Sequence, residues 1–220
     1  RSEFSGSKYF QEIFSDKERA EFHLDGHAEV LREEICRLLK QKKIINQDVE
    51  LENLHKGLSS EMREYNFDNG VNKISQCFYE NDQKFRKAYL GLIQFLYQDI
   101  FKFPFYFQDT PTIRLHCPNG KNSEHYPRYH TDVGYSHPPQ EINLWIPLTK
   151  PLGKQQHGFR LMGLEGTRKF LEGADYDFEK FVNSAIESKE FNNSCNEYAP
   201  QTSTKLGDCL AFDSRCLHTG

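Results

Sequence analysis

The chain has 220 residues, of which 37% are hydrophobic and 27% are charged, and its formal net charge is -4. This length fits one globular domain with a sizeable core, so we expect a single domain over residues 1–220. Lys and Arg form no basic stripe, which argues against a nucleic-acid partner. No apolar run approaches the ~20 residues of a membrane span, and no signal-peptide pattern opens the chain. These features argue against a membrane partner and favour a soluble, cytoplasmic protein.

The first hundred or so residues carry mainly helical signals. Ser15-Asp-Lys-Glu18 matches a capping box, which predicts a helix that begins near residue 16. After a break at Asp25-Gly26, apolar residues recur at helical spacing from Val30 to Leu39 and again from Phe85 to Ile100. We therefore expect residues 1–108 to form a mainly helical support that packs on a sheet.

Residues 109–220 carry β signals, because short alternating segments lie between turns rich in Pro, Gly and Asn. These segments are 111–117, 141–149 and 205–213. In the second segment Asn143 and Trp145 share the face opposite the aliphatic residues, and that face would line a cavity. A helical patch at about 163–190 interrupts the strands as an insertion or a lid. The fold class that we predict is α+β.

His130 and Asp132 are two residues apart, so in an extended segment both side chains lie on the same face and can reach one ion. Such a triplet is weak evidence alone. A predicted strand, Gly207 to Asp213, is followed by a short turn and then by His218, which supplies a third ligand from a distant strand end. The alternative is that the two histidines are ordinary polar residues on unrelated strands.

Two imidazoles and one carboxylate suit Fe(II) and leave positions open for a bidentate ligand and for dioxygen. A structural zinc would normally have four protein ligands, often thiolates. His23-Leu-Asp-Gly-His27 lacks the glutamate of a zinc-protease motif, and the chain has no P-loop and no G-x-S-x-G. The sequence thus favours a mononuclear non-haem iron site over a protease, a serine hydrolase or a nucleotide-binding protein.

The stretches YPRYHTDVGYSHPPQEINLWIPLTKP and GDCLAFDSRCLHTG resemble the phytanoyl-CoA dioxygenase-type Fe(II)/2-oxoglutarate oxygenases, and within them the bacterial group named after a streptomycin-biosynthesis oxygenase. The resemblance covers roughly residues 111–220. It implies a double-stranded β-helix, a jelly-roll or cupin-like barrel, with Fe(II) on His130, Asp132 and His218 and with 2-oxoglutarate and O2 as cosubstrates. Because Asp132 is a carboxylate and leaves no room for chloride, the resemblance favours a hydroxylase over a halogenase.

In this family an arginine about ten residues beyond the distal histidine pairs with 2-oxoglutarate, and this chain stops at Gly220. Either the chain is truncated at its C-terminus, or another residue does this work. Arg114 is the best internal substitute, with a surface ion pair as its alternative role. Asn143 and Trp145 are candidate cosubstrate contacts, with plain barrel filling as the alternative.

Tyr135 and His137 follow the H-x-D turn and are candidate substrate contacts, although a plain loop role is the competing interpretation. His116 and His125 flank the region, where packing or hydrogen bonding is expected. The six cysteines show no C-x-x-C pair and are expected to be reduced core thiols.

The sequence therefore predicts a dioxygenase that hydroxylates a small polar metabolite such as a sugar or an aminocyclitol. The alternative from another class is a cupin-like metal-binding isomerase or a non-redox small-molecule binding protein. A protein or nucleic-acid hydroxylase of the same fold is less favoured, because the charge balance is acidic. The oligomeric state and the substrate identity are left open.

Overall fold

The computed structural model describes residues 18–46, 48–59, 62, 73–80, 82–114, 129–150 and 159–219. Contacts divide them into two compact units. One consists of the described residues within Arg1–Phe22, Pro127–Ile146 and Pro151–Gly220, and the other of those within His23–Tyr126 and Pro147–Lys150. We call them the β unit and the helical unit. The expectation of one domain, with its helical half packed on the sheet, stays a prediction.

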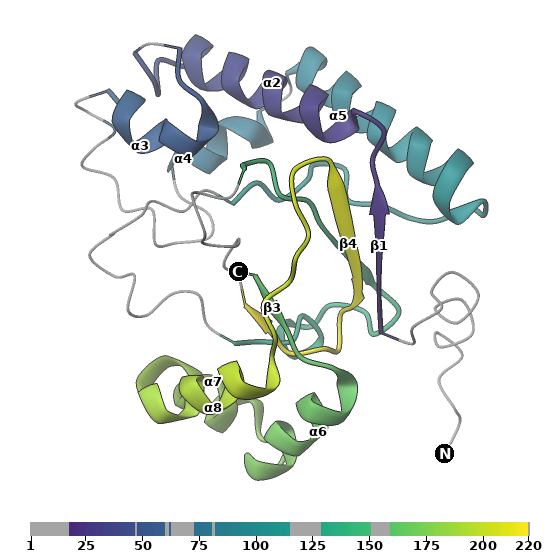
Figure 1. The fold of residues 1–220 in the computed structure, drawn as a ribbon, viewed down its shortest axis with the longest axis vertical. Coiled ribbons are helices and arrows are strands. Elements are labelled where there is room, and N and C mark those ends of the chain that lie inside the picture. Colours follow the sequence, from purple (N-terminus) through teal and green to yellow (C-terminus); the bar gives the residue numbers. More distant parts are fainter. Residues whose placement is uncertain are drawn as a thin grey trace. The chain divides into compact units, whose positions relative to one another are not determined.

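The helical unit is built around two long helices that lie side by side, α2 (His27–Gln41) and α5 (Gln83–Phe95) (Figure 1). Short 3-10 segments occupy Leu51–Asn53 and Cys77–Tyr79, and a π-helical segment, Leu96–Phe101, follows α5. The short helices α3 and α4 occupy Leu54–Gly57 and Lys73–Gln76.

The helical periodicity of the sequence is confirmed for α2 and α5. α2 begins after the predicted break, where Gly26 has a φ of 85°. Its apolar residues recur every three or four positions, which places them on one buried face. α5 is capped by Asp82, whose carboxylate accepts hydrogen bonds from the backbone N–H groups of Lys84 and Phe85 in the first turn.

A clamp around Arg32 fastens segment 147–150 within the helical unit. The Arg32 guanidinium bonds both carboxylate oxygens of Glu52 and the carbonyl of Leu148, and Glu52 accepts the backbone N–H of Lys150. Burial alone would raise the pKa of the Glu52 carboxyl, but the hydrogen bonds from Arg32 and Lys150 outweigh burial and lower that pKa to about 2. The charged form of Glu52 therefore stabilises this unit.

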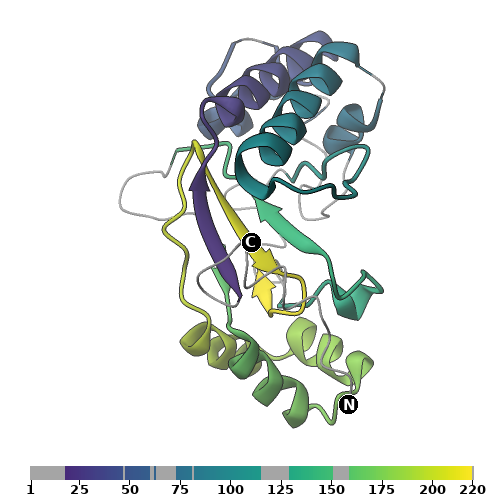
Figure 2. The same cartoon turned by 90° about the vertical axis from the view of Figure 1, so that its right-hand side faces the viewer.

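A three-stranded sheet in the order β1-β4-β2 belongs to the β unit except for His23, the last residue of β1 (Figure 2). Its strands are Arg19–His23, Asp208–Asp213 and Ile142–Trp145. A second sheet pairs β3 (Arg160–Leu161) with β5 (His218–Thr219) in antiparallel fashion. The strands of the described residues form no closed barrel. The double-stranded β-helix stays a prediction, whereas the mixture of helix and antiparallel sheet is observed.

The predicted helix near residue 16 is wrong where the chain is described. Ser15 lies outside the described residues, and Glu18 leads directly into strand β1. The backbone N–H of Asp213 bonds the carbonyl of Glu18, and the Thr204 hydroxyl donates to the Glu21 carboxylate. Pairing with a distant strand therefore outweighs a capping signal that is only local.

Of the three predicted strands, the second and the third are shorter than expected, and the described part of the first is not a strand. β2 ends at Trp145, shortly before Pro147, which has no backbone N–H to donate to a ladder. Residues 111–114 have no regular secondary structure, and residues 115–117 lie outside the described part. The third segment is confirmed as β4, and it leads through a turn at Ser214 to His218, as the sequence predicts.

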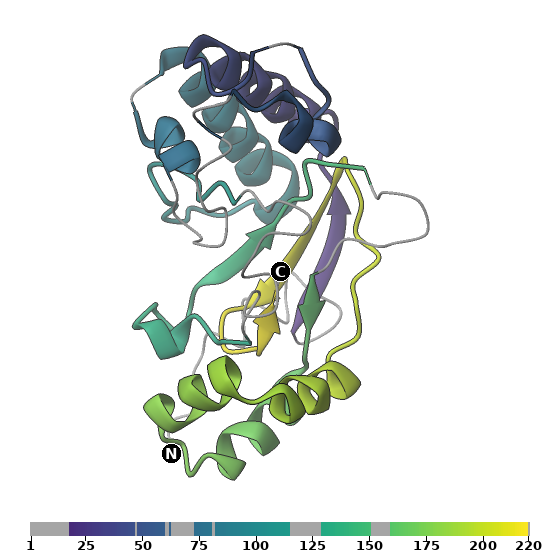
Figure 3. The same ribbon diagram turned by 90° about the vertical axis from the view of Figure 1, so that its left-hand side faces the viewer.

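The predicted helical insertion consists of three helices, α6 (Leu164–Gly173), α7 (Phe178–Glu187) and α8 (Lys189–Tyr198), so it extends past residue 190 (Figure 3). Its buried side chains pack with Tyr129 and Leu217, each of which immediately precedes a histidine of the predicted metal site. The insertion therefore shares a hydrophobic core with the segments that carry the ligands. The members of this cluster are Tyr129, Met162, Ala174, Phe181, Ala185, Cys195, Ala199 and Leu217.

The described cysteines are free thiols, and all but Cys36 are buried, as predicted; Cys117 lies outside the described residues. Burial raises the pKa of the Cys77 and Cys195 thiols to about 12, which keeps them protonated and inert. None of the helices in the described part of the chain combines the length and the hydropathy of a membrane span.

The Arg32 clamp predicts a pH dependence of stability. Because the pKa of folded Glu52 lies below its ordinary value of 4.5, the contribution is complete at neutral pH and disappears as the pH falls from about 4.5 towards 2. Glu52→Gln should lower the free energy of unfolding by roughly 2 kcal/mol at pH 7, and the difference from wild type should shrink at acid pH. Urea unfolding between pH 7 and pH 3 measures this difference.

The matched control is Glu50→Gln, since the Glu50 side chain also meets Arg32 but is 73% exposed. This substitution should change the stability by less than about 1 kcal/mol. Equal pH dependence in wild type and Glu52→Gln would contradict the assigned role of Glu52.

Candidate metal centre

The two histidines of the predicted site face each other across a backbone bridge. The N–H of His130 donates to the carbonyl of His218 at 3.1 Å, and the N–H of His218 donates to the carbonyl of His130 at 2.9 Å. Residues that exchange both bonds in an antiparallel pair project their side chains to the same face. The two rings accordingly lie together, with centroids 4.3 Å apart.

Asp132 reaches the same face because it lies two residues beyond His130. Its backbone N–H donates to the carbonyl of Ser214 at 3.1 Å, and its own carbonyl accepts from Tyr135 at 2.9 Å and from His137 at 3.2 Å. This turn, which contains the 3-10 segment Val133–Tyr135, ends the extended segment directly after the carboxylate. The H-x-D spacing thus places both side chains as the sequence predicts.

His218 is held by hydrogen bonding and by aromatic packing. Its Nδ1 lies 3.0 Å from the carbonyl of Cys216, so Nδ1 carries the proton and Nε2 is the candidate metal donor. The ring packs against Phe212 and Phe159, with centroids 4.8 and 5.8 Å away. With its side chain only 8% exposed, His218 has a fixed orientation.

The donor atoms of His130, Asp132 and His218 lie within 4.8 Å of one another. Nε2 of His130 is 3.5 Å from Oδ1 of Asp132, and Nε2 of His218 is 3.7 Å from Oδ2. Ligands about 2.1 Å from one ion and at right angles are about 3 Å apart, so small side-chain movements would bring all three donors onto one divalent ion. Two neutral imidazoles and one carboxylate fit Fe(II) and leave part of its coordination sphere open.

The helical insertion is bonded to both histidine segments. The Tyr129 hydroxyl donates to the side-chain oxygen of Asn196 in α8 at 2.7 Å, and burial raises the Tyr129 pKa. The backbone N–H of Leu217 donates to the hydroxyl oxygen of Thr167 in α6 at 2.9 Å. Residues adjacent to His130 and His218 are therefore anchored to α8 and α6.

One of the two predicted substrate contacts lies against the site. The Tyr135 ring is 5.6 Å from that of His130 and meets Phe178 of α7 edge-on at 5.3 Å. The same Phe178 ring fills the space where a Cβ on Gly134 would stand, at 2.1 Å, so a larger residue at Gly134 would push the loop and α7 apart. Tyr135 is 52% exposed, so it can contact a ligand from solvent.

His137 makes a different contact, with its Nδ1 2.9 Å from the Glu141 carboxylate. The bond joins the two ends of the loop before β2. The roles of Tyr135 and His137 in substrate binding stay predictions.

The predicted cosubstrate contacts are placed differently from one another. On β2, Asn143 donates from its amide to Oδ2 of Asp132, and Trp145 stacks on Phe159 at 4.6 Å. The face of β2 that holds Asn143 and Trp145 therefore meets Asp132 and the Phe159 ring, but contact with a keto acid stays a prediction. Arg114 is an exposed residue of the helical unit, and its proposed role is likewise untested. His116 and His125 lie outside the described residues.

Sequence reasoning missed the supports of the ligands, above all Thr167, Asn196 and Phe159. Alternation along Asp208–Asp213 places Phe212 on the same side as Leu210, so the sequence could have predicted that Phe212 is a core residue. No local pattern pairs the others with the histidines.

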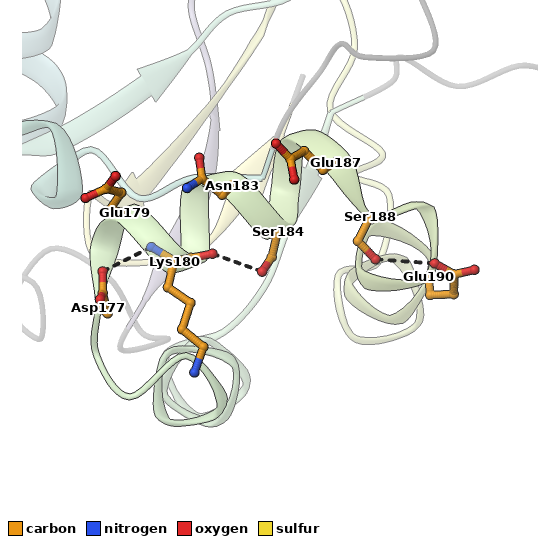
Figure 4. A pocket seen from close by; sticks show the side chains of 8 residues that line it. All are labelled: Asp177, Glu179, Lys180, Asn183, Ser184, Glu187, Ser188 and Glu190. Atoms are coloured by element: carbon orange, nitrogen blue, oxygen red, sulfur yellow. Dashed lines mark hydrogen bonds between the residues drawn. The ribbon is translucent and has the colours of Figure 1, made fainter.

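An open hollow on the outside of α7 and α8 contains none of the triad residues. Its lining is mainly acidic and hydroxylic, with the single cation Lys180 (Figure 4). The bonds drawn there, such as that from Ser184 to the carbonyl of Lys180, stabilise the helices themselves. The metal donors therefore gather elsewhere in the β unit.

No family model matches the chain, and no solved structure matches it. Over 76 residues the chain is 34% identical to the streptomycin biosynthesis protein StrG of Streptomyces griseus. The matched part is 34% of this chain and 36% of StrG, so the chain spans about a third of the length of that protein. The similarity is thus distant and partial.

The triad predicts binding of a divalent metal. Co(II) added to the metal-free protein should bind and raise the melting temperature, because a ligand that binds only the folded state stabilises it. Asp132→Ala should abolish both effects, whereas Asp175→Ala, which removes an exposed carboxylate paired with Lys180, should leave them unchanged. Calorimetric titration and thermal unfolding give the two readouts, and binding that persists in Asp132→Ala would place the metal elsewhere.

Two substitutions of Thr167 should have opposite effects on Co(II) binding, because only one of them keeps the hydrogen bond with Leu217. Thr167→Val keeps the shape but leaves a buried N–H without an acceptor, which should cost about 1–3 kcal/mol of stability and weaken Co(II) binding. Thr167→Ser keeps the hydroxyl and should retain most of the Co(II) affinity. Similar Co(II) affinities for the two variants would show that this bond does not position His218.

Proposed function

We propose that the protein is an Fe(II)- and 2-oxoglutarate-dependent dioxygenase that hydroxylates a small polar metabolite in a biosynthetic pathway. The observation that carries the proposal is the convergence of His130, Asp132 and His218 on one face. Three protein donors are too few for a typical structural zinc site, and they suit an ion that must also bind small molecules. The partial similarity to StrG supports a role as a biosynthetic enzyme.

The residues of the chain would divide the work as follows. His130, Asp132 and His218 hold the ion, and Phe159 and Phe212 shield the His218 ring from water. When bound, Fe(II) and 2-oxoglutarate supply oxygen activation, in which substrate, O2 and 2-oxoglutarate give hydroxylated product, succinate and carbon dioxide.

Substrate binding is proposed for the loop that follows Asp132. Tyr135 offers an exposed aromatic ring beside His130, and the pair of His137 and Glu141 offers polar groups on the same loop. An aromatic face together with hydrogen-bonding groups suits a sugar or an aminocyclitol, which matches the substrate class expected from the resemblance.

Anaerobic titration tests the proposal against a metal-binding isomerase or binding protein. Fe(II) followed by 2-oxoglutarate should produce a weak visible charge-transfer band, and admission of oxygen should yield succinate. Succinate added in place of 2-oxoglutarate should give no band, because it lacks the chelating keto oxygen. Asp132→Ala should lose the band and Asp175→Ala should keep it. Fe(II) binding without the band in the full-length wild-type protein would favour the isomerase or binding protein.

A further inference from the structure

Among the described residues, a neutral donor on strand β2 bonds the Asp132 carboxylate. Asn143 lies on β2 opposite Phe212 of β4, and its amide nitrogen donates to Oδ2 of Asp132. The register of the two strands fixes the position of Asn143, because each residue of β2 has a partner in β4. The bond therefore ties a ligand on a loop to the central sheet.

This bond controls a torsion that the backbone of Asp132 leaves open. The hydrogen bonds of the Asp132 backbone fix the turn, but rotation of the carboxylate about its terminal bond is broad and roughly two-fold. With Oδ2 bonded to Asn143, Oδ1 lies 3.5 Å from Nε2 of His130 and Oδ2 lies 3.7 Å from Nε2 of His218, so the Asn143 amide competes with a metal ion for Oδ2. The Asp132 side chain is only 18% exposed, so water is a limited substitute for the amide.

The number of Asp132 carboxylate oxygens that bind the metal decides how many of its coordination positions stay open. A carboxylate can bind through one oxygen or through both, and binding through both occupies an additional position. Engagement of Oδ2 by an amide N–H favours binding through one oxygen. The coordination position that is left open in this way is one that a bidentate keto acid needs.

We propose that Asn143 is a positioning residue of the metal centre, whose amide holds the Asp132 carboxylate so that a single oxygen binds the metal. The inference rests on the proposed function of the triad. It gives Asn143 a role that differs from the direct cosubstrate contact expected from the sequence. A leucine at this position has similar volume but no donor, and an alanine removes the donor without adding bulk.

The test uses Co(II) alone as the first probe, bound to metal-free protein. Asn143→Leu and Asn143→Ala should each weaken Co(II) binding about tenfold or more, which is the usual effect of losing a partner of a metal ligand. They should also change the visible absorption of bound Co(II), which reports its coordination. The matched control is Asn192→Leu, which removes an amide that donates to the carbonyls of Ala185 and Ser188, away from the triad.

The second probe is 2-oxoglutarate added to the anaerobic Fe(II) protein. In both Asn143 variants the charge-transfer band should shift and the affinity for 2-oxoglutarate should fall, whereas Asn192→Leu should match wild type. Thermal unfolding identifies any variant that does not fold. If one Asn143 variant fails to fold, the other is the one compared with wild type.

The outcomes separate the two proposals. If wild type binds Co(II) and both Asn143 variants match it in affinity and in absorption, the role of Asn143 is overturned and the proposed function stands. If wild type binds neither Co(II) nor Fe(II) with 2-oxoglutarate, the proposed function fails, and the role of Asn143 fails with it.

Discussion

The paired backbone hydrogen bonds between His130 and His218 are the interaction on which the candidate site depends. They join two segments that are far apart in sequence, and they set the register that turns both imidazoles to one face. A slip of one residue in either segment would turn its histidine to the opposite face. Asp132 follows His130 by two residues, so the same register also places the carboxylate.

The supports of this bridge come from three directions. The sheet contributes Asn143 to the Asp132 carboxylate, α6 accepts the N–H of Leu217 through Thr167, and α8 accepts the hydroxyl of Tyr129. Each contact is made by a candidate metal ligand or by the residue directly before one. Partners of this kind orient metal ligands and tune their affinity. The short strands and the helical insertion therefore act together on a single cluster of donor atoms.

The sequence predicted those features that are encoded by local spacing. The H-x-D triplet, the strand that precedes His218 and the shared face of Asn143 and Trp145 follow from alternation with a period of two. β1 could not be predicted, because its strand character comes from pairing with β4 while Glu18 belongs to a local capping pattern. Thr167 and Asn196 carry no signal at all, since their partners are distant in sequence.

The packing of the helical insertion limits how the site can open. Phe181, Ala185 and Cys195 share one core with Tyr129 and Leu217. If α6, α7 and α8 swung away as a rigid body, these apolar side chains would be exposed to water at about 25 cal/mol per Å2, and the anchors of both histidines would break. Entry and exit of small molecules are therefore expected to depend on local motion of the loop around Tyr135, with the helices as its fixed frame.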